Sequence, residues 1–435
     1  MNLRMVIAAA VIIGGVAAGA YFGAGKSAEP VAEFSTVETE AVTERPPAAP
    51  ASSPAAPPAV SKTPLSHPAP VSPPPALSSK ELSAAVKAGK RISDGQCEGE
   101  GVPYKLSVSP MRAEDFSYVI PYGTMVGGHV TPIDHQYFSP TVFHSPPDTY
   151  EVRAMADAKL VRYEPHPTRI RLIFSVSCTY FYYYDLLTSV VPEINEKSIP
   201  LRVKAGELIG HIGGQTLDFA VWDTTKPLAG FVVPEHYDPE PWKLYTADPL
   251  LYYTDELRAM ILSKYVRIAE PRSGKIDYDS DGKLIGNWFL DGTVNYAGGA
   301  NSTSAQRYWT GHLAIVPDAY SPDRFFISVG YLEGEGRQNQ FSVPKNSPNP
   351  ATVGVGDGLV KYDFKNWAYL KPDGSEWDKM TRPNGEVTLE NERYQPMGCA
   401  LAELLEPRKL KFETFMGQRC SAVDGFSGSA KIYRR

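Results

Sequence analysis

Two histidines and an aspartate lie close together in one short stretch of the chain. His129, Asp134 and His135 fall within the residues 127–135, which read GGHVTPIDH. Imidazole and carboxylate side chains bind borderline and hard metal ions, and they transfer protons near neutral pH. The stretch is therefore a candidate metal or acid–base site. A polar turn whose histidines bond to neighbouring backbone would contain the same residue types.

The elements that would position this stretch are mostly β-strands. Alternating or aromatic-rich runs, each bounded by turn residues, predict strands at residues 150–154, 158–163, 170–176, 179–184, 201–210 (with a glycine turn inside) and 217–222. In the last of these, alternation places Thr216 and Asp218 on the face opposite Leu217 and Phe219. One helix is expected at Thr254–Lys264, with two acids in its first turn.

Three segments resemble the lysostaphin-type zinc endopeptidases, whose β-fold is called the duplicated hybrid motif. They are residues 128–134, the YYDL of residues 183–186, and residues 203–219 with VKAGELIG and LDFAV. The resemblance covers residues 115–225. It implies an all-β domain at residues 96–272, built as a duplicated-hybrid-motif sandwich or barrel.

The resemblance also implies a metal site, from which this sequence departs. Asp134 matches the family's aspartate, but Val130 stands four residues before it and His129 is one residue out of step. Asp218 stands where the third ligand would be. The set His129, Asp134 and Asp218 would suit zinc, or a harder divalent cation because it contains two carboxylates.

The family uses two further histidines, which transfer protons and stabilise the oxyanion. This sequence has Asp185 and Thr216 at the matching positions. If the domain is active, His135 or His211 would have to act as the base, with Asp185 beside the reacting groups. Three readings stay open: an active hydrolase, a groove that binds a metal without cleaving, and a groove that does neither.

A second β-domain is expected at residues 274–435. Strand-like runs at 308–316, 325–331, 358–364, 399–405, 409–415 and 429–433 predict an antiparallel barrel or sandwich. The segment Gly286-Asn287-Trp288 is similar to the Gly-x-Trp that opens lipocalin barrels. Residues 277–282 (DYDSDG) match half of a calcium loop, but Trp288 stands where that loop needs Glu. We expect a hairpin instead, with strands at 275–278 and 283–289.

The N-terminal residues indicate export. An apolar run from Met5 to Phe22 predicts a signal peptide or membrane anchor at residues 1–26. A Pro/Ala/Ser-rich linker at residues 27–95, expected to be disordered, ends in a helix-prone piece at Ser79–Lys90. The folded regions are therefore expected outside the cytoplasm, tethered or secreted.

Four cysteines support the same compartment. An even number in an exported chain predicts two disulfides, Cys399 with Cys420 and then Cys97 with Cys178. The net charge of -6 without a basic stripe argues against binding to nucleic acid.

These features together predict an exported, membrane-tethered protein of the cell envelope. Its endopeptidase-like domain has lost catalytic residues, and we expect it to act as a binding or scaffolding module for cell-wall glycan or peptide. The alternative is an active metal-dependent hydrolase of peptidoglycan or another envelope polymer.

Overall fold

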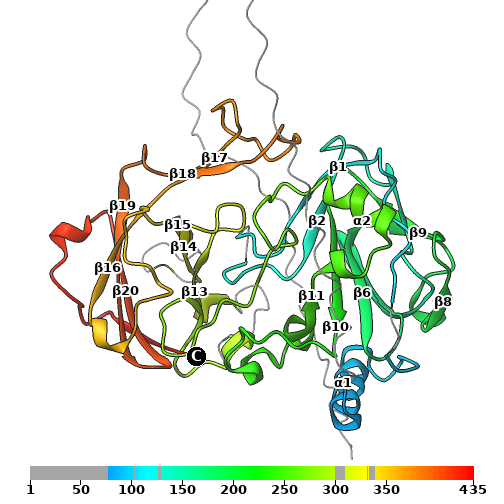
Figure 1. The fold of residues 1–435 in the computed structure, drawn as a ribbon, viewed down its shortest axis with the longest axis horizontal. Coiled ribbons are helices and arrows are strands. Elements are labelled where there is room, and N and C mark those ends of the chain that lie inside the picture. The colour runs from blue at the N-terminus through cyan, green and yellow to red at the C-terminus, as the bar shows by residue number, and fades with distance from the viewer. Residues whose placement is uncertain (1–76, 102–103, 126–128, 299–308, 331, 333–338) are drawn as a thin grey trace, which may run out of the picture. The chain divides into compact units, whose positions relative to one another are not determined.

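An eight-stranded antiparallel sheet has the strand order β1-β2-β10-β6-β5-β4-β8, with the short β11 paired to β10 (Figure 1). The computed structural model describes residues 77–435 apart from 102–103, 126–128, 299–308, 331 and 333–338. The strands of this sheet are β1 (Phe116–Ile120), β2 (Gln136–Pro140), β4 (Ala158–His166), β5 (Arg169–Ser175), β6 (Tyr180–Leu187), β8 (Leu201–Val203), β10 (Leu217–Asp223) and β11 (Thr246–Ala247).

Side chains of β10 alternate between the two faces of the sheet, as its sequence predicts. Leu217, Phe219 and Val221 lie in the main apolar core, whereas Ala220 and Trp222 belong to a separate buried cluster on the other face. Both faces are therefore covered. Asp218 alternates with the same face as Ala220 and Trp222, so it lies on the face away from the main core.

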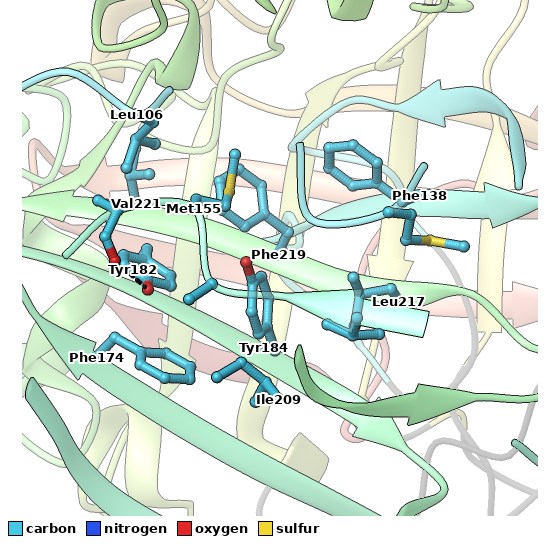
Figure 2. Close-up of a cluster of buried hydrophobic side chains, with 14 of the residues drawn as sticks. Leu106, Phe138, Met155, Phe174, Tyr182, Tyr184, Ile209, Leu217, Phe219 and Val221 are labelled. Atoms are coloured by element: carbon cyan, nitrogen blue, oxygen red, sulfur yellow. Dashed lines mark hydrogen bonds between the residues drawn. The ribbon is translucent and has the colours of Figure 1, made fainter. Parts of the chain in front are cut away.

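The main core lies between this sheet and a three-stranded sheet of order β3-β9-β7. Its strands are β3 (Tyr150–Arg153), β7 (Ser189–Val190) and β9 (Leu208–Ile212). Figure 2 shows Tyr182 and Tyr184 of β6 beside Phe174 and Ile209, with Phe219 close by. The rings of Phe174 and Tyr182 stack with their centroids 4.7 Å apart. The strands predicted from residues 150 to 222 are all present, so this part is the expected β-sandwich.

The second β-region is a closed antiparallel barrel in the order β12-β13-β14-β15-β16-β19-β20-β21. Its strands are β12 (Gly286–Leu290), β13 (His312–Pro317), β14 (Phe325–Val329), β15 (Asn339–Ser342), β16 (Val360–Lys365), β19 (Pro396–Glu406), β20 (Lys409–Met416) and β21 (Lys431–Arg434). The barrel is closed where β21 pairs with β12. Of the two architectures expected for this region, the barrel is therefore the one formed.

Apolar side chains fill the barrel. Trp288, Ile315, Phe364 and Leu410 are among its buried core residues. Arg435 closes one end, with its guanidinium 3.9 Å from the centre of the Trp288 ring. The interior is thus a packed core.

Some elements of this second region differ from those predicted from the sequence. Residues 275–278 form no strand, so the expected hairpin is wrong. Instead, the Asp277 carboxylate accepts from the Gly230 N–H at 2.8 Å and the Asp279 carboxylate accepts from the Asn287 N–H at 2.7 Å. These aspartates hold loops against neighbouring segments. Three short strands were not predicted: β15, and the pair β17 (Ala368–Leu370) and β18 (Thr388–Glu390).

Two α-helices lie at the places expected. α1 (Ser79–Ile92) begins with a capping box in which Ser78 and Glu81 bond to each other's backbone. Its last residue, Ile92, is buried in the apolar cluster that contains Ala220 and Trp222, so this helix belongs to the folded part. The second is α2 (Asp255–Leu262). Short 3₁₀ helices are η1 (Glu196–Ser198), η2 (Pro234–Tyr237), η3 (Pro241–Tyr245), η4 (Pro249–Leu251), η5 (Asn295–Ala297), η7 (Val355–Asp357) and η8 (Cys420–Ala422).

The four cysteines form two disulfides, Cys97–Cys178 and Cys399–Cys420, which are the expected pairs. The predicted signal peptide or anchor at residues 1–26, and the linker up to residue 76, lie outside the described residues. In the part of the chain that the structure describes, no helix is both long and apolar enough to cross a membrane.

Candidate functional site

His135 lies between two buried aspartates. Asp134 and His135 come directly before β2, and Asp218 lies on β10, which pairs with β2. The Nδ1 atom of His135 is 3.2 Å from Asp134 Oδ1, and its Nε2 atom is 3.3 Å from Asp218 Oδ2. All three residues are only 6% exposed. The structure thus brings three of the predicted site residues into one polar cluster.

The next members of the cluster come from η3, about a hundred residues later in the chain. The ammonium nitrogen of Lys243 lies 2.9 Å from Asp134 Oδ2. The indole N–H of Trp242 donates to the same oxygen at 3.1 Å. Both oxygens of Asp134 therefore face partners from within the protein, with His135 on one side and η3 on the other.

The two aspartates differ in their electrostatics. Burial disfavours the charged form of Asp134, but the charges and hydrogen bonds of Lys243 and His135 outweigh it and hold its pKa well below the usual range. Burial raises the pKa of Asp218 to about 7, with Asp185 adding to this and His135 opposing it. Asp218 Oδ1 also has no hydrogen-bond partner among the described residues. Asp134 is thus favoured as a carboxylate, whereas burial favours the protonated form of Asp218.

Asp185 is the cross-strand partner of Asp218 but is neutralised differently. Arg169 donates to its Oδ2 atom, and the Nε of Arg171 donates to the same atom at 2.8 Å. Burial opposes ionisation of Asp185, but the two arginines lower its pKa. A carboxylate held by two guanidinium groups is a structural ion pair, and the two positive charges make it a weak base for taking a proton from a substrate.

His129 lies beside the cluster without a polar side-chain contact to it. Its ring packs edge-on against that of His135, with centroids 5.6 Å apart. Its backbone carbonyl accepts from Gln340 Nε2 of β15 at 2.8 Å. Desolvation by burial is the main cause that lowers the pKa of His129 to about 3, and electrostatic interactions with the neighbouring His135 and Lys243 add to it. Its imidazole is therefore neutral at physiological pH.

A metal ion fits this arrangement poorly. Within the described ranges, no group of three or more His, Cys, Asp or Glu side chains is placed to hold one. The structure therefore does not assemble His129, Asp134 and Asp218 as a ligand set. The reason lies in the cluster itself, because an ammonium and an indole face Asp134 and the His135 ring stands between the two carboxylates.

Four residues of this site were not found from the sequence: Arg169, Arg171, Trp242 and Lys243. The two arginines carried a signal, because alternation along β5 places them on the same face as the buried Ile173. A charged pair on a buried face needs a counter-ion. Trp242 and Lys243 carried none, since their position depends on how a distant loop folds back.

A cavity of about 310 Å³ lies away from this cluster, at the β4–β8 edge of the large sheet. It is lined in part by Glu98, Asp157, Lys159, Arg202 and Lys204. These charges pair with one another, Glu98 with Lys159 and Arg202, and Asp157 with Lys204. The charged side chains of the cavity are therefore already engaged in ion pairs with one another.

Two solved structures are similar to parts of this chain. One is a structure of Helicobacter pylori Csd3, at 14% identity and a TM-score of 0.24, covering 39% of this chain and 42% of that one. The other is a putative peptidase M23 from Pseudomonas aeruginosa, at 13% identity and a TM-score of 0.22, covering 40% of this chain and 59% of that one. At these scores neither similarity assigns a family or an activity. No protein-family model matches the chain, and no curated protein is similar to it.

Proposed function

We propose that this protein is a non-hydrolytic binding or scaffolding module of the cell envelope, exported and tethered by its N-terminal segment. The observation that carries this proposal is the state of Asp185. At the place where the sequence resemblance implies a catalytic histidine, the chain has a carboxylate bound by Arg169 and Arg171. A group neutralised in this way supports the fold and does not transfer protons.

Burial of the cluster supports the same conclusion. Asp134, His135 and Asp218 are each 6% exposed, and Lys243 is 4% exposed. Cleavage of a polymer requires the reacting bond to come within about 3–3.5 Å of the catalytic groups. A glycan or peptide strand could therefore reach His135 only if the segments that bury the cluster moved aside.

The location is supported by the two disulfides. Cys97–Cys178 and Cys399–Cys420 use all four cysteines of the chain. Disulfides persist in oxidising compartments and are rare in the cytosol. Within such a compartment, the partner class that we propose, from the sequence resemblance alone, is cell-wall glycan or peptide.

A second candidate function is a hydrolase, and one observation favours it. The carboxyl of Asp218 has its pKa raised to about 7 and lies next to His135. Acid–base pairs of this kind gather at catalytic sites. In that case His135 would be the base.

One experiment separates the two. Full-length protein, purified from the envelope fraction in mild detergent, is incubated with dye-labelled insoluble peptidoglycan. We expect the protein to sediment with the wall material and to release no dye above background, with or without added zinc. Asp291→Ala removes an exposed aspartate that pairs with Arg434 on the barrel, and it serves as the matched control for Asp134→Ala.

Release of dye that disappears in Asp134→Ala and on chelation would establish the hydrolase instead. Protein that neither releases dye nor sediments with the wall would contradict the choice of partner.

A further inference from the structure

Lys243 is a buried lysine that faces a buried carboxylate. Its ammonium lies 2.9 Å from Asp134 Oδ2 and 3.2 Å from Glu240 Oε2, and the residue is 4% exposed. An unpaired ammonium would be costly at such a depth. The position is therefore built around the charge of Lys243.

Aromatic rings fix where this lysine lies. The neighbouring Trp242 stacks on Trp222 of β10, with centroids 5.7 Å apart, and Trp222 stacks on Tyr183 of β6 at 5.2 Å. On its other side, the ammonium lies 4.9 Å from the centre of the Tyr296 ring of η5. A cation over an aromatic face gains further stabilisation when water is excluded.

The carboxylate of Asp134 has a cation from the chain itself. The Lys243 ammonium lies 2.9 Å from Asp134 Oδ2, and the His135 ring lies 3.2 Å from Oδ1 on the other side. The second carboxylate within reach of the ammonium, Glu240, belongs to the turn that precedes η3 and is partly exposed, at 29%.

From this geometry we infer that the ammonium of Lys243 is the resident cation of the Asp134–His135–Asp218 cluster, in the place where the resembling enzymes would hold a metal ion. The cluster consequently needs no metal to fold, and η3 is fixed on the sheet by the same contact. This role of Lys243 is independent of which polymer the protein binds.

The inference is tested by thermal unfolding of the full-length protein with and without a chelator, combined with metal analysis. We expect the purified protein to carry much less than one equivalent of any transition metal. Neither EDTA nor one equivalent of zinc should change its Tm by more than about 1 °C, since a ligand stabilises only the state that it binds.

Substitutions test the contact itself. Lys243→Met removes the charge and leaves Asp134 buried without its cation, so we expect Tm to fall by roughly 5 °C or more. Adding Asp134→Asn to Lys243→Met removes the orphaned charge as well and should recover part of this loss. Lys204→Met is the matched control, because Lys204 pairs with Asp157 and both side chains are exposed, at 79% and 63%. Its Tm should stay within about 1–2 °C of the unsubstituted protein.

Two results would overturn the inference: a Tm of the unsubstituted protein that falls on chelation and returns with zinc, or a Lys243→Met variant whose Tm changes as little as that of Lys204→Met. Should Lys243→Met fail to fold, the chelation result on the unsubstituted protein still decides. A metal-free, chelator-insensitive protein that does not sediment with peptidoglycan would contradict the proposed partner and leave the role of Lys243 supported.

Discussion

The barrel and the large sheet solve the problem of burial in different ways. Inside the barrel, the inward side chains are apolar, with Trp288, Leu313 and Phe412 among them. On the outer face of the large sheet, apolar rings surround ionisable groups, and these groups are satisfied by charges from elsewhere in the chain. The barrel interior is thus stabilised by apolar packing, whereas this face of the sheet depends on buried ion pairs. Removal of one residue of an ion pair is therefore expected to lower stability more on this buried face than at an exposed ion pair on the barrel surface.

The largest expected effect is at Asp185. Asp185→Ala leaves Arg169 and Arg171 without their shared carboxylate, and Arg169 is buried with a side-chain exposure of 7%. Removal of one partner from a buried ion pair costs about 3–5 kcal/mol of the free energy of unfolding. Urea unfolding followed by tryptophan fluorescence measures this loss. The matched control is Asp291→Ala, whose exposed pair with Arg434 lies on the barrel, and its unfolding midpoint should not move. Equal losses in the two variants would remove the distinction between the regions.

A somewhat smaller effect is expected in the barrel core. Leu410→Ala deletes a fully buried side chain from β20 and leaves a cavity among rings such as Phe412 and Tyr433. Leucine-to-alanine changes in cores cost about 2–5 kcal/mol, depending on how far the site collapses. The same urea experiment measures it. Loss of less than about 1 kcal/mol would indicate a barrel interior that is loosely packed.

The smallest effect, counted per pH unit, concerns the pH dependence at Asp218. Its carboxyl has a pKa of about 7 in the folded protein against 3.8 for the ordinary group, so the folded state binds more protons between these values. Stability from this group is therefore present at low pH and is lost as pH rises from about 4 to 7, by at most about 1.4 kcal/mol per pH unit.

Asp218→Asn should remove this slope and stabilise the protein at pH 8 relative to pH 5, compared with the unsubstituted chain. Unfolding free energies measured between pH 5 and 8 give the two slopes. If the substituted and unsubstituted proteins have the same slope, Asp218 does not titrate in that range.

Local patterns in the sequence predicted most of the β-structure. Alternation along residues 217–222 gave the correct inward face of β10, and turn residues marked most barrel strands. The failures were at short or irregular strands such as β15, where four residues carry little periodic signal. The expected hairpin at residues 275–289 failed for a different reason. A turn forms at residues 280–283, but residues 275–278 form no strand, and Asp277 and Asp279 bond to the backbone N–H groups of Gly230 and Asn287.

The site was predicted less completely than the fold. The sequence supplied Asp134, His135 and Asp218, but it could not supply Lys243. A residue more than a hundred positions away becomes a neighbour only through tertiary packing, here through the stack of Trp242 on Trp222. The chemistry of the cluster depends on that residue, since its charge decides whether an external cation is needed.

The most direct test of this account is a crystal structure of the protein soaked in zinc and recorded at the zinc absorption edge. The account predicts the Lys243 ammonium at hydrogen-bonding distance from Asp134, with no anomalous peak at bonding distance, about 2.0–2.2 Å, from Asp134, His135 or Asp218. A zinc peak bound by Asp134, with Lys243 displaced from the cluster, would contradict it.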